Sequence, residues 1–560
     1  MAAILAAMGA VVAVPARSEP VGSVAQVSEI PGDVTFDADD PRVAFGADGR
    51  GLAVYIGEGT GGETEVYGRP VGASGGPTGS QRRLTHVGTD GDVTAQARVP
   101  DVVYNSRAGE FLVVSENALA NDQQVGVQRV ALDGAPIGSS VTISETGGAG
   151  PGTDGDNARP QVAYDPVRDE YLVAWIDGRD VLGNEVRAQR LTASLAQVGP
   201  PDFFVSEVGG ANTNAGRIDA GYGGGTFLVT WSDFVGGNDE EIIGRRVNSG
   251  GGVLGGEVQL SRQGPIDDDE LESNRPAVAY NAVSNQFLVV WEGDLPNGVG
   301  SGEHEIFGQR VSAAGAQVGS DLRITHQGTD GDLESDAEEP AIAAGPGNGE
   351  YLVAWQGKGP SQEVEAYGQR LSSAGAAVGA VAPRFSDQGP AGDPAFYADT
   401  AATAFNPASH EFLVVWRGTR SLDVATTDSE DEIFARRATS PFTPPATTPI
   451  PKPTAVPIAP SAPRPAAPLR ATDVIRFPAT RRCGPRRTLK IRLRRPGGLK
   501  LVSARVVING KRRPLVRGRG LAKPIVLKRL PQGRLKVKVT VTTSKGKKLT
   551  VTRRYRSCKR

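Results

Sequence analysis

Closely spaced carboxylates recur in the loops of this sequence and are the residues best suited to hold a cation. Segments 85–94, 150–160 and 325–340 each contain Thr-Asp-Gly-Asp. Carboxylates one residue apart around a glycine suit a hard cation that takes six to eight oxygen ligands. No loop matches the full EF-hand pattern, so solvated turn residues are the alternative. The pattern predicts calcium as a cofactor, bound by Asp90, Asp92, Asp154, Asp156, Asp330 and Asp332.

The tryptophans all occupy one position of a repeat, at the end of an apolar run such as FLVVW. They are Trp175, Trp231, Trp291, Trp355 and Trp416. One interpretation is packing in the protein interior. The other is an arc of aromatic rings on one face, where the tryptophans would be ligand-binding residues that stack on sugar rings. Both interpretations stay open.

Candidates for nucleophilic or acid–base catalysis are few. His86 and His326 occupy equivalent repeat positions, whereas His304 and His410 are isolated. No Ser-His-Asp set, cysteine nucleophile, zinc spacing or phosphate loop can be assigned. Neighbouring carboxylates could serve a glycosidase, but they are too numerous for a pair to be chosen. The sequence therefore predicts no catalytic residue and favours a protein that is not an enzyme.

These residues are set in a repeat with a period of about 60 residues. Each copy contains an apolar triplet, a fully apolar run and a segment that opens with Glu or Gln, and most end in a fourth segment. The triplets lie in 41–45, 100–104, 160–164, 217–221, 276–280, 340–344 and 401–405. The apolar runs are 51–55, 111–115, 171–175, 227–231, 287–291, 351–355 and 412–416. The repeated acidic position is interpreted as part of the scaffold.

Every segment has the length and composition of a strand, so each copy is predicted to be a four-stranded antiparallel meander. The second strand is apolar on both faces, which requires a sheet covered on both sides. Stacked four-stranded sheets of this kind form a β-propeller. The last copy lacks its fourth segment, and residues 24–32 resemble one. We therefore expect an all-β protein whose residues 17–440 form a seven-bladed β-propeller, with the N-terminal strand closing the last blade.

The two ends of the chain differ from this body. Residues 1–16 are apolar and end in small residues, as in a signal peptide. Residues 441–469 form a Pro-rich linker. Residues 470–560 contain 31 Lys and Arg but one acidic residue, Asp473. They alternate apolar and polar positions as in a small C-terminal antiparallel β-sandwich. Cys483 and Cys558 bracket it, as one disulfide would.

Two resemblances accompany these patterns. The unit P-x-V-A-Y-N … Y-L-V-V-W … E-I-x-G-Q-R-V, in residues 22–440, resembles repeats of secreted bacterial β-propeller proteins. The tail from RRC to RRYRSC resembles a basic C-terminal module on secreted proteins of actinobacteria. The second resemblance implies an extracytoplasmic protein and an immunoglobulin-like sandwich. Neither supplies catalytic residues.

Together these features predict a secreted or cell-surface binding scaffold. A propeller face would recognise a glycan or protein ligand, and the basic module would hold the protein to an anionic cell-wall polymer. The acidic propeller itself is the other candidate for binding this module. Nucleic acid is not expected, because Phe477 and Tyr555 are the only aromatic residues of the tail. No transmembrane segment is expected. The alternative functions are a polysaccharide-acting propeller hydrolase or lyase, and a structural surface protein.

Overall fold

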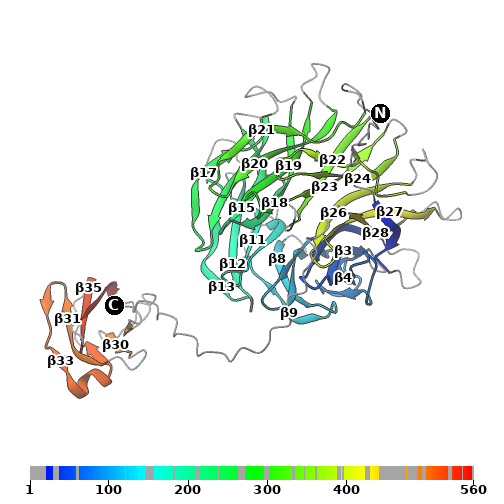
Figure 1. Ribbon diagram of the computed structural model, residues 1–560. Helices are drawn as coiled ribbons and strands as arrows, with labels where there is room; N and C mark the ends of the chain where they lie inside the picture. The colour runs from blue at the N-terminus through cyan, green and yellow to red at the C-terminus, as the bar shows by residue number, and fades with distance from the viewer. Residues whose placement is uncertain are drawn as a thin grey trace, which may run out of the picture. The chain divides into compact units, whose positions relative to one another are not determined.

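The structure is a computed structural model of the 560-residue chain. It divides into two compact units, Met1–Ala446 and Thr447–Arg560 (Figure 1). The residues that it describes are 20–29, 37–58, 62–119, 122–144, 157–180, 183–207, 215–235, 239–262, 271–295, 302–328, 330, 334–345, 347, 349–359, 362–387, 393, 396–422, 429–439, 474–476, 489–494, 500–527, 533–544 and 547–557. The predicted signal peptide and linker lie outside them.

The described part of the first unit consists of four-stranded antiparallel sheets, here called blades 1 to 7 in chain order. Blades 1 to 3 are β2 (Ala38–Phe45), β3 (Gly51–Glu58), β4 (Thr64–Val71) and β5 (Arg82–Arg83); β6 (Ala95–Asn105), β7 (Glu110–Leu119), β8 (Asp122–Ala131) and β9 (Pro136–Thr142); and β10 (Asn157–Asp165), β11 (Glu170–Asp180), β12 (Gly183–Thr192) and β13 (Gln197–Phe204). Blades 4 and 5 are β14 (Ile218–Gly223), β15 (Thr226–Val235), β16 (Asp239–Asn248) and β17 (Val253–Gln259); and β18 (Ser273–Asn281), β19 (Gln286–Asp294), β20 (His304–Ser312) and β21 (Gln317–Arg323). Blades 6 and 7 are β22 (Asp336–Ala344), β23 (Tyr351–Lys358), β24 (Val364–Leu371) and β25 (Ala377–Val378); and β26 (Ala398–Asn406), β27 (Glu411–Leu422), β28 (Ser429–Thr439) and β1 (Pro20–Gln26).

The first strands of the blades contact one another in a closed cycle. Each of β2, β6, β10, β14, β18 and β22 touches the first strand of the next blade, and β26 touches β2. The blades are therefore arranged around a common centre, and the four strands of each sheet follow one another from the centre outward (Figure 1). This arrangement confirms the predicted all-β propeller fold.

Blade 7 is completed by the N-terminal strand. β1 pairs antiparallel with β28, with Val21 opposite Arg437 and Gln26 opposite Phe434. The strand begins earlier in the chain than predicted. Beyond it, Val27 and Ser28 still donate backbone hydrogen bonds to the carbonyl oxygen of Ile433. The two ends of the propeller therefore hold each other without a covalent link.

One polar contact recurs in the blades and explains the repeated acidic position. In blade 1, Thr85 donates its hydroxyl hydrogen bond to the buried carboxylate of Glu65 and accepts one from the backbone N–H of Val66, at 2.8 Å. The same pair of contacts joins Ser206 to blade 3, Ser261 to blade 4, Thr325 to blade 5, Ser386 to blade 6 and Ser28 to blade 7. The conserved geometry supports the interpretation of these glutamates as scaffold.

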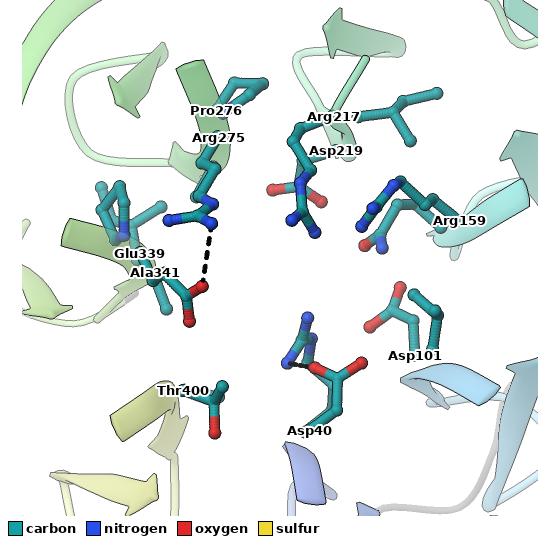
Figure 2. A pocket seen from close by; sticks show the side chains of 18 of the residues that line it. Asp40, Asp101, Arg159, Arg217, Asp219, Arg275, Pro276, Glu339, Ala341 and Thr400 are labelled. Carbon is teal, nitrogen blue, oxygen red and sulfur yellow. Dashed lines mark ion pairs between the residues drawn. The ribbon is translucent and has the colours of Figure 1, made fainter. Parts of the chain in front are cut away.

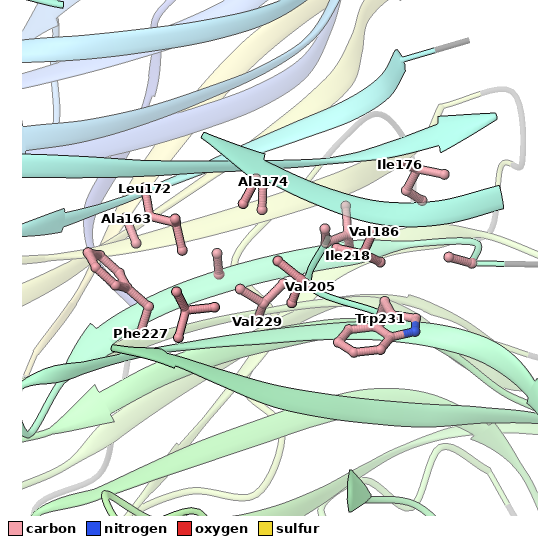
Figure 3. Packing of buried hydrophobic residues seen from close by; sticks show 14 of the residues in the cluster. Ala163, Leu172, Ala174, Ile176, Val186, Val205, Ile218, Phe227, Val229 and Trp231 are labelled. Carbon is pink, nitrogen blue, oxygen red and sulfur yellow. The ribbon is translucent and has the colours of Figure 1, made fainter. Parts of the chain in front are cut away.

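The apolar second strands lie between neighbouring sheets. Between blades 3 and 4, for example, Leu172 and Ala174 pack with Phe227, Val229 and Trp231 in one buried cluster (Figure 3). Both faces of the second strand are covered by adjacent blades, so apolar residues are buried at consecutive positions.

The second unit contains two antiparallel sheets around its own apolar core. Its elements are β29 (Ile475–Arg476), β30 (Leu489–Leu493), β31 (Leu501–Ile508), β32 (Lys511–Arg512), β33 (Val516–Arg517), the 3-10 helix η2 (Gly518–Ala522), β34 (Ile525–Leu527), β35 (Gly533–Thr543) and β36 (Lys548–Ser557). In β35, Val537 and Val539 are buried whereas Lys536 and Lys538 are exposed, as the alternation predicts. Among the residues described in either unit, no helix is long and apolar enough to cross a membrane.

Candidate functional site

The first strands of the seven blades line one cavity of about 470 Å³, here called the axial pocket. Its side chains point from different blades toward a shared central space (Figure 2). A cavity of this volume is in the range of small-ligand sites, which is about 300–1,000 Å³. Because every blade contributes to its wall, differences between the repeats become differences between the sides of the pocket.

The wall contains two rings of residues. The first, the bulge ring, lies where a β-bulge or the start of the strand projects a side chain into the pocket. Its members are Asp40, Val99, Arg159, Arg217, Arg275, Glu339 and Thr400. The second, the strand ring, lies at the next position of the first strand that faces the pocket. Each member pairs with the equivalent residue of the second strand in its own blade. Its members are Arg42, Asp101, Gln161, Asp219, Ala277, Ala341 and Ala402.

The strand ring divides the pocket into a polar and an apolar side. Blades 1 to 4 contribute Arg42, Asp101, Gln161 and Asp219, whereas blades 5 to 7 all contribute alanine. A repeat that served only the scaffold would have no reason to confine the polar residues of this ring to four adjacent blades. We take this departure from repeat symmetry as the mark of a functional site.

The bulge ring is built from strained backbone. Six of its seven members have φ between 45° and 55°, including the β-branched Val99 and Thr400. Non-glycine residues adopt this region at an energetic cost and are enriched at functional sites. The neighbouring blade stabilises several of them, because Glu116 accepts a hydrogen bond from Arg159 N–H at 3.2 Å and Glu292 from Glu339 N–H at 2.9 Å. The bulge therefore directs these side chains into the pocket.

Asp101 and Asp219 link adjacent blades as well as lining the pocket. One carboxylate oxygen of Asp101 accepts a hydrogen bond from the N–H of Val162 in blade 3 at 2.8 Å. Asp219 accepts the equivalent bond from Val278 N–H in blade 5 at 2.7 Å. In each case the other oxygen accepts from the N–H of the following residue. These bonds fix the position and orientation of both carboxyl groups.

Both carboxyl groups titrate near neutral pH. Burial raises the pKa of Asp101 to about 6, against the opposing effects of its N–H donors and Arg42. Burial, and then repulsion by Asp101, raises the pKa of Asp219 to about 7. Two carboxyl groups in one cavity, each able to exist in either protonation state at physiological pH, are suited to acid–base chemistry.

A second titratable cluster lies between blades 5 and 6. His304, which is isolated in the sequence, lies 3.4 Å from Asp294 and 3.2 Å from Glu338. Its hydrogen bond with Glu338 raises the pKa of His304 to about 9, so the imidazole is protonated at neutral pH. The same contact lowers the pKa of Glu338 to about 2. The cluster is a half-buried ion pair rather than a proton shuttle.

The tryptophans lie in the interior and not on a face of the propeller. All five have no exposed area. The rings of Trp355 and Trp416 stack against Tyr367 and Phe434 of the neighbouring strand, with centroids 6.2 and 6.3 Å apart. The hypothesis that these residues bind sugar rings is therefore wrong, because adjacent blades cover the second strand. The packing interpretation is correct.

The aspartates of the predicted calcium loops divide into described and undescribed residues. Asp90 and Asp330 pair with Arg83 and Arg323, at 2.8 and 2.7 Å, and Asp92 caps its own turn through Thr94. Asp154, Asp156 and Asp332 lie outside the described residues, as do Cys483 and Cys558. Among the residues that are described, no group of three or more His, Cys, Asp and Glu side chains could hold a metal ion. Calcium binding and the disulfide stay predictions.

Sequence reasoning missed the axial pocket because one repeat was aligned in the wrong register. The alignment of the triplet at 217–221 with the other apolar triplets is wrong by one residue. In the structure Asp219 pairs with Thr230 just as Asp101 pairs with Val114. Blade 4 has no bulge there, so Asp219 and not Ile218 is the equivalent of Asp101. With this register the polar strand ring of blades 1 to 4 becomes visible in the sequence.

Comparison with known proteins identifies no family for this chain. No family model matches it, and no curated protein matches it. A protein of unknown function from Dyadobacter fermentans has a TM-score of 0.41 at 11% identity, covering 75% of this chain and 98% of the other. An α-L-arabinofuranosidase from Fusarium graminearum has a TM-score of 0.40 at 13% identity, covering 61% and 92%. An α-L-arabinanase from Penicillium chrysogenum, solved with arabinobiose, has a TM-score of 0.38 at 13% identity, covering 60% and 92%. This likeness concerns the fold, and no residue role is carried over from these proteins.

Proposed function

We propose that the protein binds a glycan in the axial pocket and cleaves it by acid–base catalysis, rather than acting as a binding scaffold alone. The observation that carries this proposal is the pair of carboxyl groups, Asp101 and Asp219, in one cavity with pKa values of about 6 and 7. Asp219, with the higher value, would protonate the glycosidic oxygen as the C–O bond breaks. Asp101 would take the proton from the attacking water, whose oxygen then bonds to the sugar carbon.

The two sides of the pocket suit a sugar ring. A pyranose or furanose presents hydroxyl groups at its edge and C–H groups on its face. The polar side offers donors from Arg42 and acceptors from Asp101 and Asp219. The alanines of blades 5 to 7 offer a small apolar surface for the C–H groups.

Filling the apolar side of the pocket provides a direct test. Ala341 lines the cavity and contributes no charge, so Ala341→Phe removes ligand space and leaves the acid–base groups in place. We expect this variant to lose at least about tenfold in glycan affinity and in the release of reducing ends, as a blocked pocket demands. A panel of polysaccharides, measured by calorimetry and reducing-end assay, checks this result.

Ala314→Phe is the matched control, because Ala314 is exposed in a turn and does not line the pocket. It should leave affinity and product release unchanged. If Ala341→Phe retains both while its melting temperature stays near that of the wild type, the ligand binds elsewhere and the proposal is wrong. Binding without product release in the wild type would leave the scaffold alternative.

For the second unit, we propose that it holds the secreted protein to an anionic cell-wall polymer. All the Lys and Arg residues of this unit whose side chains are described are exposed, namely Lys490, Arg492, Arg494, Lys500, Arg505, Lys511, Arg512, Arg513, Arg517, Lys523, Lys536, Lys538, Lys547, Lys548 and Arg553. Such an array binds a polyanion through many weak contacts and releases its counterions.

Cosedimentation with purified cell walls across a salt series tests this second role. The full chain should sediment with the walls at low salt, and its affinity should fall by about a hundredfold or more between 50 and 200 mM salt. A chain ending at residue 440 is the control and should stay in solution. Binding that is absent at low salt, or indifferent to salt, would contradict the tethering role.

A further inference from the structure

The arginines of the axial pocket fall into two classes. Arg42 pairs with Asp40 at 2.8 Å, and Arg275 pairs with Glu292 at 3.1 Å and Glu339 at 3.3 Å. Arg159 and Arg217 line the same cavity from blades 3 and 4, and neither guanidinium has a hydrogen bond or an ion pair with any residue that the structure describes. Figure 2 shows both side chains directed into the central space.

The positions of these two guanidinium groups lower the stability of the folded protein. Burial, and then repulsion by Arg159 and Arg275, lowers the pKa of Arg217 to about 10. Burial also lowers the pKa of Arg159, against the opposing effects of the Glu116 and Asp40 carboxylates, and repulsion by Arg275 adds to the lowering. Like charges on neighbouring blades, partly withdrawn from water and without a direct ion pair, destabilise a protein. Such groups are retained where function needs them.

There is space beside these groups for a ligand. Arg159 and Arg217 line the axial pocket and also a second cavity of about 220 Å³, which Asn184, Glu240 and Asn274 help to form. Glu240, the carboxyl group of that second cavity, accepts a hydrogen bond from Asn274 at 3.1 Å and has no ion pair with either arginine among the described contacts. The guanidinium donors are therefore available on the side that faces the axial pocket.

We infer that Arg159 and Arg217 form an anion subsite, and that the glycan bound in the axial pocket carries an anionic substituent. The chemistry is that of a sugar carboxylate or a sulfate ester, because both present coplanar or clustered oxygens that a guanidinium fork binds bidentately. Arg275 and Arg42 already have carboxylate partners, so they border the subsite and are not part of it. This inference rests on the proposed function only in placing a glycan in the axial pocket.

The test compares anionic oligosaccharides with their neutral counterparts. The probes are uronic-acid oligosaccharides against their methyl esters, and sulfated oligosaccharides against the desulfated forms. We expect the wild type to bind one anionic form at least about tenfold more tightly than its neutral counterpart, in line with charge-assisted hydrogen bonds. In the double variant Arg159→Gln/Arg217→Gln this preference should vanish, because the affinity for the anionic form should fall to that for the neutral form.

The stability of the variants provides a second readout. Because the two charges repel each other, the double variant should melt at the same temperature as the wild type or higher. Arg50→Gln is the matched control: Arg50 is exposed, pairs with Asp48 in a turn and lies outside the pocket wall. It should change neither the preference nor the affinity.

The outcomes separate this inference from the proposed function. Equal binding of anionic and neutral glycans, with both lost in Ala341→Phe, would overturn the anion subsite and leave the axial pocket as the glycan site. An anionic preference that depends on the two arginines, without release of reducing ends, would support the subsite and count against cleavage. A sharp fall in the melting temperature of the double variant would assign the arginines to the fold and overturn the inference.

Discussion

Removal of residues 20–28 is expected to destabilise the propeller by about 5 kcal/mol or more, and to make the truncated protein aggregate. β1 supplies the outer strand of blade 7, and Val27 behind it is fully buried. Each lost backbone hydrogen bond costs about 1 kcal/mol, and a buried polar group left without a partner costs about 1–3 kcal/mol. Loss of Ser28 removes a hydroxyl donor from the carboxylate of Glu432 and the side-chain acceptor from the N–H of Ile433. The uncovered edge of β28 would then template association with other chains.

Thermal melting and light scattering of the truncated protein check this expectation. The matched control lacks residues 1–19 only and keeps β1, so it should melt like the full chain. Ser28→Ala tests the polar contact separately and should cost about 2 kcal/mol, since the strand stays but both partners of the hydroxyl lose their bonds. Unchanged melting after removal of residues 20–28 would mean that blade 7 is stable without the N-terminal strand.

The fold could be predicted because its repeats encode it redundantly. Runs such as FLVVW report burial on both faces of a strand, and that pattern has one common solution in stacked sheets. The fourth segment missing after residue 438 and the matching segment near Ser28 predict the closure of the ring, which β1 and β28 then form. The boundary of β1 was displaced because strand pairing depends on the partner strand, which the local sequence does not contain.

The pocket could not be predicted by the same means, because it depends on departures from the repeat. The bulges that turn Arg159 and Arg275 inward consist of a positive φ before proline, and local preferences disfavour that conformation for most residues. The pKa values of Asp101 and Asp219 result from burial among seven blades, which no single repeat contains. The tryptophan hypothesis was wrong for the opposite reason: an aromatic residue repeated in most blades indicates packing.

Asp219→Asn and Asp101→Asn are each expected to reduce the rate of glycan cleavage by about a hundredfold to ten-thousandfold, the usual contribution of a general acid or base. Asp219 must be protonated and Asp101 ionised, so the rate in the wild type should be highest near pH 6–7. It should fall on the acidic side as Asp101 gains its proton, and on the alkaline side as Asp219 loses its own. Reducing-end assays from pH 4 to 9 measure this profile.

Stability should depend on pH through the same two groups. The folded pKa values of both lie above the unfolded value of 3.8, so the folded protein keeps protons that the unfolded chain releases. The free energy of unfolding from this source is therefore greatest below about pH 4 and falls as the pH rises to about 7, by up to about 7 kcal/mol for the two groups together at about 1.4 kcal/mol per pKa unit. In the double variant Asp101→Asn/Asp219→Asn this part of the pH dependence should be absent.

The pH dependence of stability, measured together with the rate of cleavage, distinguishes a catalytic role of Asp101 and Asp219 from a purely structural one. An asparagine can accept only one of the two N–H bonds that each carboxylate accepts, so both variants should be less stable than the wild type at acidic pH. This difference should shrink or reverse as the pH rises, because the wild type loses stability when its buried carboxyl groups ionise and asparagine does not ionise. Asp133→Asn, a change in an exposed turn where the side chain accepts one bond from Ala135, is the matched control and should alter neither slope nor rate. Variants that lose the pH dependence of stability but keep the rate of cleavage within a few-fold would show that the carboxyl groups only link the blades. The two groups would then titrate without taking part in catalysis.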